Sequence, residues 1–389
     1  MRRTLAAMIL CGGGLFTVST MQFAAAGTNP MPIPRLADLH QPAREAPHVW
    51  LLTKPLPQPD GLRPCCAFGY NLRAKLFGVP VPWYQLDNVV AADDTGRHHF
   101  NTGILHTLAT LTGMNSEHNG LVYTRRGGFI DLAHLRDSAD TTLWLFSQIW
   151  PHLGEARTLK LDDELGERII RLFPFTPPAS ATSRYRLTVY LAAHLAFELA
   201  AWHEVAQWYG FESVPGFSEG VSAFSPEDLY SNLLGTRVAI DLLNAGAGSS
   251  LSNYQRAMSG MIPQALAQLQ AESPPATRFH FDMVDSRWWN SRCRLPDKFL
   301  LRYRNYDVGD RRFPSRPREA VIPLKLSLPD KYQGTALSRF GRLEILRGRA
   351  MARLPSPPLH YLFSDFPTLA EYARTSDLRK LAGLKDRCD

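Results

Sequence analysis

The chain has 389 residues, of which 45% are hydrophobic and 20% are charged, and its formal net charge is +7. A chain of this length can bury a large core, either as one extended domain or as two closely packed domains. The small positive charge favours solubility or weak attraction to anionic surfaces. It is not gathered into a basic run with interleaved aromatic residues, so we expect no nucleic-acid partner.

The first 26 residues have the three parts of a secretory signal peptide. Arg2 and Arg3 form the basic start, an apolar stretch follows, and small residues precede the expected cleavage after Ala26. We therefore expect a periplasmic or secreted protein. A lipid anchor at Cys11 is less favoured because the two residues before it are bulky. The later chain has no apolar stretch long enough to span a membrane.

The mature chain is predicted to contain an extended, proline-rich arm at 27–60, an α-rich core domain at 61–273 and a β-rich C-terminal region at 274–389 packed on that core. The predicted fold class is α+β. The helical core is built around a buried central helix at about 183–210, which ends at Gly210, a residue typical of helix C-termini.

Apolar periodicity and turn residues predict the elements before the central helix. In chain order these are a short helix at 98–114, a strand, Gly-Gly turn and strand at 119–131, a helix at 132–150, and two strands within 155–180. After the central helix we expect one helix from Ser225 and another from about Ser252. Pro263 should break or kink the second of these.

Beyond the two prolines at 274 and 275 the pattern changes to strand-like alternation. The segments FHFDMV, KFLLRYRNY, AVIPLKLSL and RLEILRGRAMARL alternate apolar and polar residues and are separated by Pro, Gly and Asp. They are the basis for the predicted β-rich region.

The central helix is apolar on nearly every side, yet it carries four ionisable residues. Buried ionisable groups must be paired, bound to metal or shifted in pKa, so they are functional candidates. His194 and Glu198 are one turn apart and suit an internal ion pair. His203 and Glu204 resemble half of a zincin motif, but Gln207 stands where the second histidine should be, which argues against that mechanism.

The next helix begins with the sequence SPEDLYSN, which contains Glu227, Asp228 and Asn232. Ser at the N-cap, Pro at N1 and a capping-box carboxylate at Asp228 explain this start structurally. That account says nothing about Asn232. The two helices are joined by a short loop, so we expect them to pack antiparallel, with Glu204 approaching Glu227 or Asp228.

A third cluster lies at the predicted start of the 132–150 helix, where Asp131 and His134 are about one turn apart. Asp131 suits a helix N-cap, with Arg136 and Asp140 as an ion pair further along. The alternative is that His134, with Asp131, serves as a metal ligand or a general base. The Gly-Gly turn before it would let a ligand approach the backbone.

Four cysteines remain after the predicted signal peptide. In an oxidising compartment we expect the Cys65–Cys66 pair to bond to Cys293 or Cys388. The alternative is a free Cys293 in a basic setting, acting as the nucleophile of a hydrolase that loosely resembles circularly permuted papain-like enzymes.

Four longer motifs resemble a family of exported bacterial proteins known only as a domain of unknown function. They are RPCCAFG at 63–69, NGLVYTRRGGFIDLAHLRDSAD at 119–140, WHEVAQWYG at 202–210 and FSPEDLYSNLLG at 224–235. The resemblance covers most of the mature chain and implies an envelope protein. It implies no activity and no catalytic residues.

The residues favour an exported, metal-dependent hydrolase that acts on an envelope-associated substrate. His134 and His203 would hold a divalent metal such as zinc or orient the substrate, and Glu204 would be the general base. Asp131, Glu227, Asp228 and Asn232 would complete the site. The competing hypothesis is a non-catalytic periplasmic binding or scaffolding protein with a buried polar network.

Overall fold

The computed structural model describes residues 35–39, 54–59, 63, 67–76, 79–100, 116–213, 218–317, 320–348, 351, 354–355, 359–384 and 388. All of them belong to one compact unit, Pro32–Asp389. Among the helices in these ranges, none is both long enough and apolar enough to cross a membrane.

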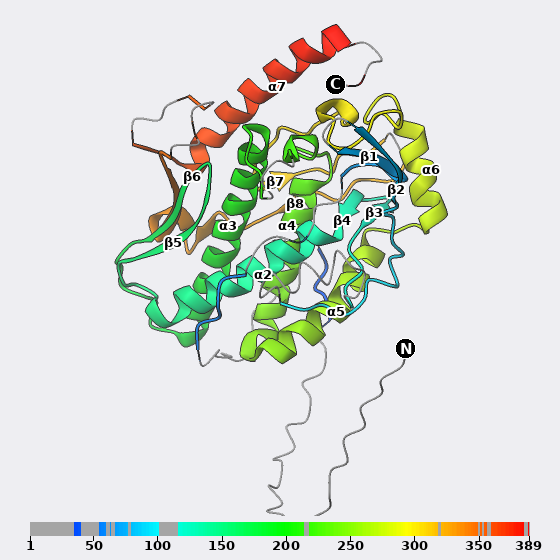
Figure 1. The fold of residues 1–389 in the computed structure, drawn as a ribbon. Coiled ribbons are helices and arrows are strands. Elements are labelled where there is room, and N and C mark those ends of the chain that lie inside the picture. Colours follow the sequence, from blue (N-terminus) through cyan, green and yellow to red (C-terminus); the bar gives the residue numbers. More distant parts are fainter. Residues whose placement is uncertain are drawn as a thin grey trace, which may run out of the picture. The chain divides into compact units, whose positions relative to one another are not determined.

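Three helices form the centre of the molecule: α2 (Leu132–Ile149), α3 (Ala181–Trp208) and α4 (Asp228–Asn244). Each of them contacts the other two (Figure 1). The predicted central helix is confirmed as α3, whose N-cap Ser180 accepts a hydrogen bond from the Ser183 amide. Gly210 follows the helix with φ +105°, the left-handed conformation expected after a helix C-terminus.

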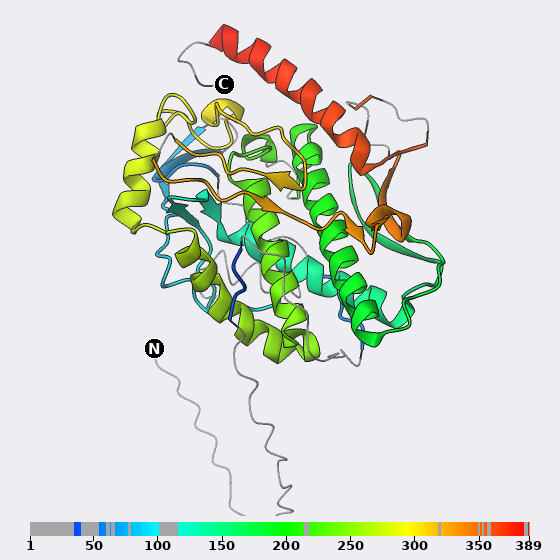
Figure 2. The same ribbon diagram turned by 180° about the vertical axis from the view of Figure 1, so that it is seen from behind.

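An antiparallel four-stranded sheet covers one flank of the helices, in the order β12-β11-β6-β5. It joins β5 (Arg157–Glu164) and β6 (Gly166–Leu172) to β11 (Gly341–Leu346) and β12 (His360–Tyr361). The sheet therefore crosses the predicted boundary at residue 273. Figures 1 and 2 show it on the side of the central helices opposite α6.

The hairpin of β3 (Leu121–Thr124) and β4 (Gly128–Asp131) leads directly into α2, as predicted for this segment. Gly128 has φ +67°, and a Cβ added there would overlap the carbonyl oxygen of Ser315. Only glycine meets both conditions, so the hairpin can pack closely against the segment that contains Ser315.

The other described elements surround this centre. They are β1 (Leu72–Leu76), β2 (Val79–Leu86), α5 (Leu251–Gln268), α6 (Pro274–Val284), β7 (Arg311–Arg312), β8 (Leu326–Ser327), β9 (Lys331–Tyr332), β10 (Thr335–Ala336) and α7 (Phe366–Leu384). Short 3-10 turns at 150–152, 219–221, 247–249, 298–300, 337–339 and 363–365 connect them.

The α+β class is confirmed. After residue 273 the RLEIL part of the predicted strand segments lies in β11, whereas other segments differ from the prediction. The FHFDMV segment is not a strand: it lies in α6, where Pro274 and Pro275 start a helix. Its buried residues Thr277, His280, Phe281 and Val284 follow helical spacing, whereas the alternation of Phe279, Phe281 and Met283 suggested a strand. Strands β7 to β10 are each two residues long, and KFLLRYRNY forms a 3-10 turn followed by irregular chain.

Three further predictions concern Pro263, the segments at 27–60 and 98–114, and the disulfide bonds. Helix α5 runs through Pro263 and does not end there. Most of the helix predicted at 98–114 lies outside the described residues, as does most of the 27–60 arm. The expected disulfide partner of Cys293 is corrected: Cys293 bonds to Cys388 with a Cα–Cα distance of 5.4 Å, so neither can bond to Cys65 or Cys66, which lie outside the described residues.

Candidate metal centre

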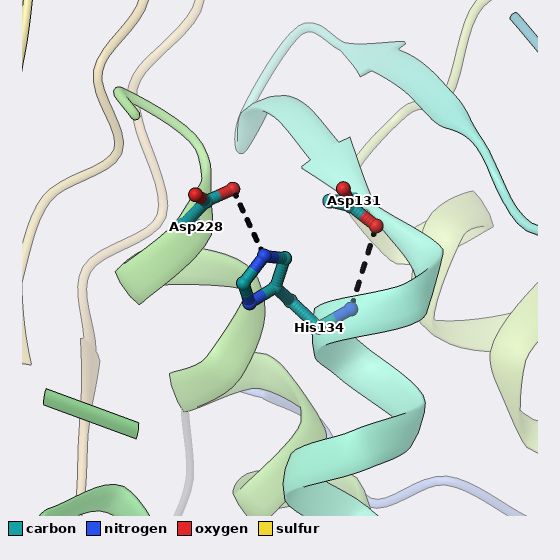
Figure 3. A group of neighbouring side chains, drawn as sticks. All are labelled: Asp131, His134 and Asp228. Atoms are coloured by element: carbon teal, nitrogen blue, oxygen red, sulfur yellow. Dashed lines mark hydrogen bonds and ion pairs between the residues drawn. The ribbon is translucent and has the colours of Figure 1, made fainter. Parts of the chain in front are cut away.

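Three side chains converge at the starts of two neighbouring helices: Asp131 and His134 of α2, and Asp228 of α4 (Figure 3). One possible ligand atom from each lies within 4.8 Å of those from the other two. The His134 Nε2 atom is 3.5 Å from Asp228 Oδ1. The His134 side chain is 10% exposed, whereas the two carboxylates are fully buried.

The end of strand β4 places the first two of these residues. Asp131 is the N-cap of α2, and its Oδ1 accepts hydrogen bonds from the amides of Ala133 at 2.6 Å and His134 at 3.4 Å. The Asp131 amide donates to Ser231 Oγ on α4 at 2.9 Å. The predicted N-cap is therefore confirmed, and the same carboxylate also faces the cluster. The cap fixes its position, so the structural and functional interpretations are compatible.

Asp228 does not have the capping role that the sequence suggested. Helix α4 begins at Asp228 with Glu227 at its N-cap, and no side chain caps this end. Neither Asp228 oxygen accepts a hydrogen bond from any residue that the structure describes. A fully buried carboxylate without hydrogen bonds costs several kcal/mol, so Asp228 is poorly explained as a helix cap and well explained as a ligand.

Asn232 lies one turn along α4 and contacts the second ring nitrogen of His134, the one that does not face Asp228. Its amide nitrogen is 3.2 Å from His134 Nδ1, and its Oδ1 accepts a hydrogen bond from Ser138 Oγ at 2.6 Å. A half-turn of the Asn232 side-chain amide exchanges the positions of its oxygen and its nitrogen. With the amide turned over, Asn232 would accept the proton of Nδ1 and leave the Nε2 lone pair directed toward Asp228.

Two more buried carboxylates adjoin the triad. Glu204, on α3, accepts a hydrogen bond from the Phe224 amide at 2.6 Å through Oε2, and Glu227 accepts one from Ser225 Oγ at 2.7 Å. The second oxygen of each accepts no hydrogen bond within the described part of the chain. Burial raises the pKa of Glu204, Glu227 and Asp228, and the like charges of the cluster raise the pKa of Glu227 and Asp228 further.

Phe224, which holds Glu204, has an unusual backbone conformation. Its φ is +55°, a left-handed value that is uncommon for a bulky residue, and its side chain is fully buried. Such strain persists only where the surrounding structure enforces it, and it is frequent at functional sites. Here the conformation directs the Phe224 amide at the Glu204 carboxylate just before α4 begins.

The donor set of Asp131, His134 and Asp228 fits a divalent transition metal. Two carboxylate oxygens and one imidazole nitrogen are typical ligands of zinc, and three protein ligands are the usual number at a catalytic zinc site. Magnesium and calcium prefer oxygen-only sets, so the imidazole disfavours them. A divalent cation would also compensate the buried negative charge of the cluster.

His203 lies outside the donor group of Asp131, His134 and Asp228. Its Nδ1 lies 3.3 Å from Glu164 Oε1, and Glu164 also forms an ion pair with Arg168 at 2.8 Å. Although burial opposes it, the Glu164 carboxylate raises the pKa of His203. His203 and Glu204 are adjacent on α3 and therefore point about 100° apart around the helix axis.

The remaining helix pair behaves as predicted. His194 Nε2 is 3.1 Å from Glu198 Oε1, one turn along α3. Glu198 Oε2 accepts a hydrogen bond from the Leu343 amide of β11 at 3.1 Å, which ties α3 to the sheet. This pair is therefore structural.

Arg312 is a neighbour of the centre that sequence reasoning missed. It lies on β7, is 2% exposed and interacts electrostatically with Glu204. The segment DVGDRRF has no helical or alternating pattern that would place this residue near the 204–232 region. Its position depends on long-range packing, so no local signal was present.

Comparison with family models matches residues 53–318 to the family described as Protein of unknown function (DUF4056). The matched segment contains Asp131, His134, Glu204, Asp228 and Arg312. Comparison with curated proteins and with solved structures finds no match. Since the family model covers more than half of the chain, this protein belongs to the DUF4056 family of proteins of unknown function.

Proposed function

We propose that this protein is a metal-dependent hydrolase of the bacterial envelope, with a divalent transition metal held by Asp131, His134 and Asp228. The observation that carries the proposal is the convergence of these three donors within 4.8 Å, next to buried carboxylate oxygens that lack hydrogen bonds in the described structure. Zinc is the metal that the donor set favours.

When bound, such an ion polarises a water molecule or a substrate carbonyl or phosphoryl oxygen. Glu204 is the residue placed to exchange a proton with the reacting group. One of its oxygens is fixed by the Phe224 amide, and the other accepts no hydrogen bond from a described residue. A carboxylate held in one orientation with a free oxygen has the geometry that a general base requires.

The envelope location rests on the predicted signal peptide and on compartment chemistry. The Cys293–Cys388 disulfide supports an oxidising compartment, because such bonds are rare in cytosolic proteins. It also argues against the cysteine-hydrolase alternative, since a disulfide-bonded Cys293 is not a thiolate nucleophile.

The direct test is metal analysis of protein purified from the periplasm without chelators. We expect about one transition-metal ion per chain in the wild type and almost none in the Asp228→Asn variant. Asp241→Asn is the matched control, because Asp241 is a buried carboxylate on the same helix whose oxygens also lack hydrogen bonds to described residues. A wild-type protein without bound metal after incubation with zinc contradicts the proposal.

A second set of assays tests hydrolysis. The Glu204→Gln variant should keep the metal and lose hydrolysis of chromogenic ester, amide or phosphate substrates, since Gln keeps the shape but cannot accept a proton. Retained hydrolysis in Glu204→Gln would contradict the role of Glu204 as the general base.

A structural metal site in a non-catalytic protein is the second candidate function, and the burial of the centre favours it. Asp131, Glu204 and Asp228 are fully buried, so a bound ion would tie α2 to α4. In that case metal removal lowers the melting temperature sharply, and Glu204→Gln changes stability without removing any activity.

A further inference from the structure

A buried arginine with unused donors lies beside the metal centre. Arg312 is 2% exposed, and its Nε and Nη1 atoms have no hydrogen-bond partner among the described residues. Arginine in a protein interior is normally paired with a carboxylate or with several carbonyl oxygens. A buried guanidinium with two nitrogen atoms that donate to no described residue therefore needs an explanation.

The segment that carries Arg312 is held at both ends by parts of the chain that position the metal centre. At one end the Asn305 amide donates to the carbonyl oxygen of Phe224 at 2.8 Å, and the amide of the same Phe224 holds Glu204. At the other end Ser315 packs against Gly128 of β4, the strand that ends at Asp131. Between these contacts, β7 pairs Arg312 with Leu326 of β8 and so fixes its backbone.

Among the described residues, the carboxylates that interact electrostatically with Arg312 do not contact it directly. Arg312 interacts electrostatically with Asp307 and with Glu204, but its Nε and Nη1 atoms donate a hydrogen bond to neither. Burial lowers the pKa of Arg312 to about 10, as expected for a guanidinium that has lost water and not gained a close anion. A ligand oxyanion would supply the missing partner.

We propose that Arg312 binds an oxyanion of the substrate, a carboxylate or a phosphate group, while the neighbouring triad holds the metal. The inference rests on the proposed metal centre and narrows its substrate to an anionic compound. Guanidinium N–H groups suit both carboxylate and phosphate oxygens, and buried charge-assisted hydrogen bonds of this type are strong. Without metal, the carboxylates of Asp131, Glu204, Glu227 and Asp228 would repel such a ligand. We therefore expect the metal and the anion to bind together.

The experiment uses zinc-loaded, desalted protein and isothermal titration calorimetry with acetate and, separately, with inorganic phosphate. The variants are Arg312→Lys, which keeps the charge but loses the planar set of donors, and Arg312→Met, which loses both. Arg311→Gln is the matched control, because Arg311 is the exposed neighbour on the same strand. Metal content and melting temperature are measured on every sample.

We expect the wild type to bind one of the two anions and Arg312→Lys to bind it about 10- to 100-fold more weakly, with metal content unchanged. Arg311→Gln should match the wild type. Acetate binding would identify a carboxylate substrate and phosphate binding a phosphate ester. If Arg312→Met does not fold, the anion affinity of Arg312→Lys alone tests the inference.

Three results would overturn the inference. If the metal-loaded wild type binds neither anion, or if Arg312→Lys binds as tightly as the wild type, Arg312 is no substrate-binding residue and the metal centre stands. If Arg312→Lys loses metal as well as anion, its role is to support the centre. A wild type that binds no metal would overturn both this inference and the proposed function.

Discussion

The buried charged residues at the start of helix α2 and those around Asp140, in its middle, differ in how they are paired. Around Asp140, two turns into the helix, Arg63 bonds to Glu117 at 2.7 Å, to Asp137 at 2.6 Å and to Asp140 at 2.9 Å. His98 Nε2 lies 2.9 Å from Asp140, and Arg136 donates to the carbonyl oxygens of His118 and Thr95. We call these residues the Arg63 network.

At the start of α2 the same kinds of residue are arranged differently. The metal centre contains the carboxylates of Asp131, Glu204, Glu227 and Asp228. One oxygen of Glu204, one of Glu227 and both of Asp228 accept no hydrogen bond from a residue that the structure describes. In the Arg63 network, three carboxylates face Arg63 and His98 through short contacts. Burial is equal in the two regions, so burial alone does not identify a site. Carboxylate oxygens that accept no hydrogen bond from a described residue distinguish the metal centre from the Arg63 network.

The first prediction breaks the Arg63 network. Replacing Arg63 by Met removes a buried cation that contacts both Glu117 and Asp140, and breaking a buried ion pair costs about 3–5 kcal/mol. We expect urea denaturation to show a loss of this size with metal binding preserved in the folded fraction. The control Arg374→Met removes an exposed partner of Glu371 and should leave the free energy of unfolding unchanged. A stability loss no larger than that of the control would show that the network is not structural.

The second prediction makes the opposite change in the metal centre. Asp228→Asn removes one negative charge from a cluster of like charges, so we expect metal-free stability to stay the same or rise. Zinc affinity should fall by about 100-fold or more, or about 2.7 kcal/mol, since losing a ligand exceeds the effect of losing an outer-shell partner. Competition with a zinc chelator measures the affinity and thermal melting measures stability. Equal zinc affinities would place the metal elsewhere.

The contrast between the regions also explains what the sequence could predict. The hairpin, α2 and α3 follow from local periodicity and turn residues, and so do the N-cap at Asp131 and the ion pair of His194 and Glu198. The approach of Glu204 to the start of α4 follows from antiparallel packing of two consecutive helices, although the connection at 209–227 is not the predicted short loop.

The remainder of the site depends on contacts that local patterns do not contain. Arg63, His98 and Glu117 reach the Arg63 network from irregular segments. Arg312 arrives from 80 or more residues along the chain in a two-residue strand. His203 faces Glu164 and not the donor group of His134, because adjacent helical residues point to different sides and His203 therefore does not follow Glu204.

The third prediction sharpens the role assigned to Asn232. Replacing it by Leu removes the hydrogen-bond partner of His134 Nδ1 while keeping the volume roughly constant. Outer-shell partners of histidine ligands typically contribute about 10- to 100-fold in metal affinity. We expect a zinc affinity reduced within that range. Asn232→Asp, which accepts the Nδ1 proton, should restore most of it, whereas no rescue by Asp would show that Asn232 only fills space.

The last prediction uses pH to distinguish the paired region from the metal centre. In the Arg63 network, burial opposes protonation of His98, but the carboxylates of Asp140 and Glu117 raise its pKa above 6.5, and Tyr254 also contacts Asp140. A histidine whose pKa is raised on folding contributes stability that is complete below its unfolded pKa of about 6.5 and is lost as the pH rises through its folded pKa. Each unit of increase contributes about 1.4 kcal/mol. We therefore expect the difference in unfolding free energy between the wild type and His98→Asn to be largest near pH 6 and to shrink toward pH 9. Urea denaturation across this range measures it. A difference that stays constant or grows with pH would mean that His98 is neutral in the folded protein, and that the Arg63 network holds an excess of negative charge like the metal centre.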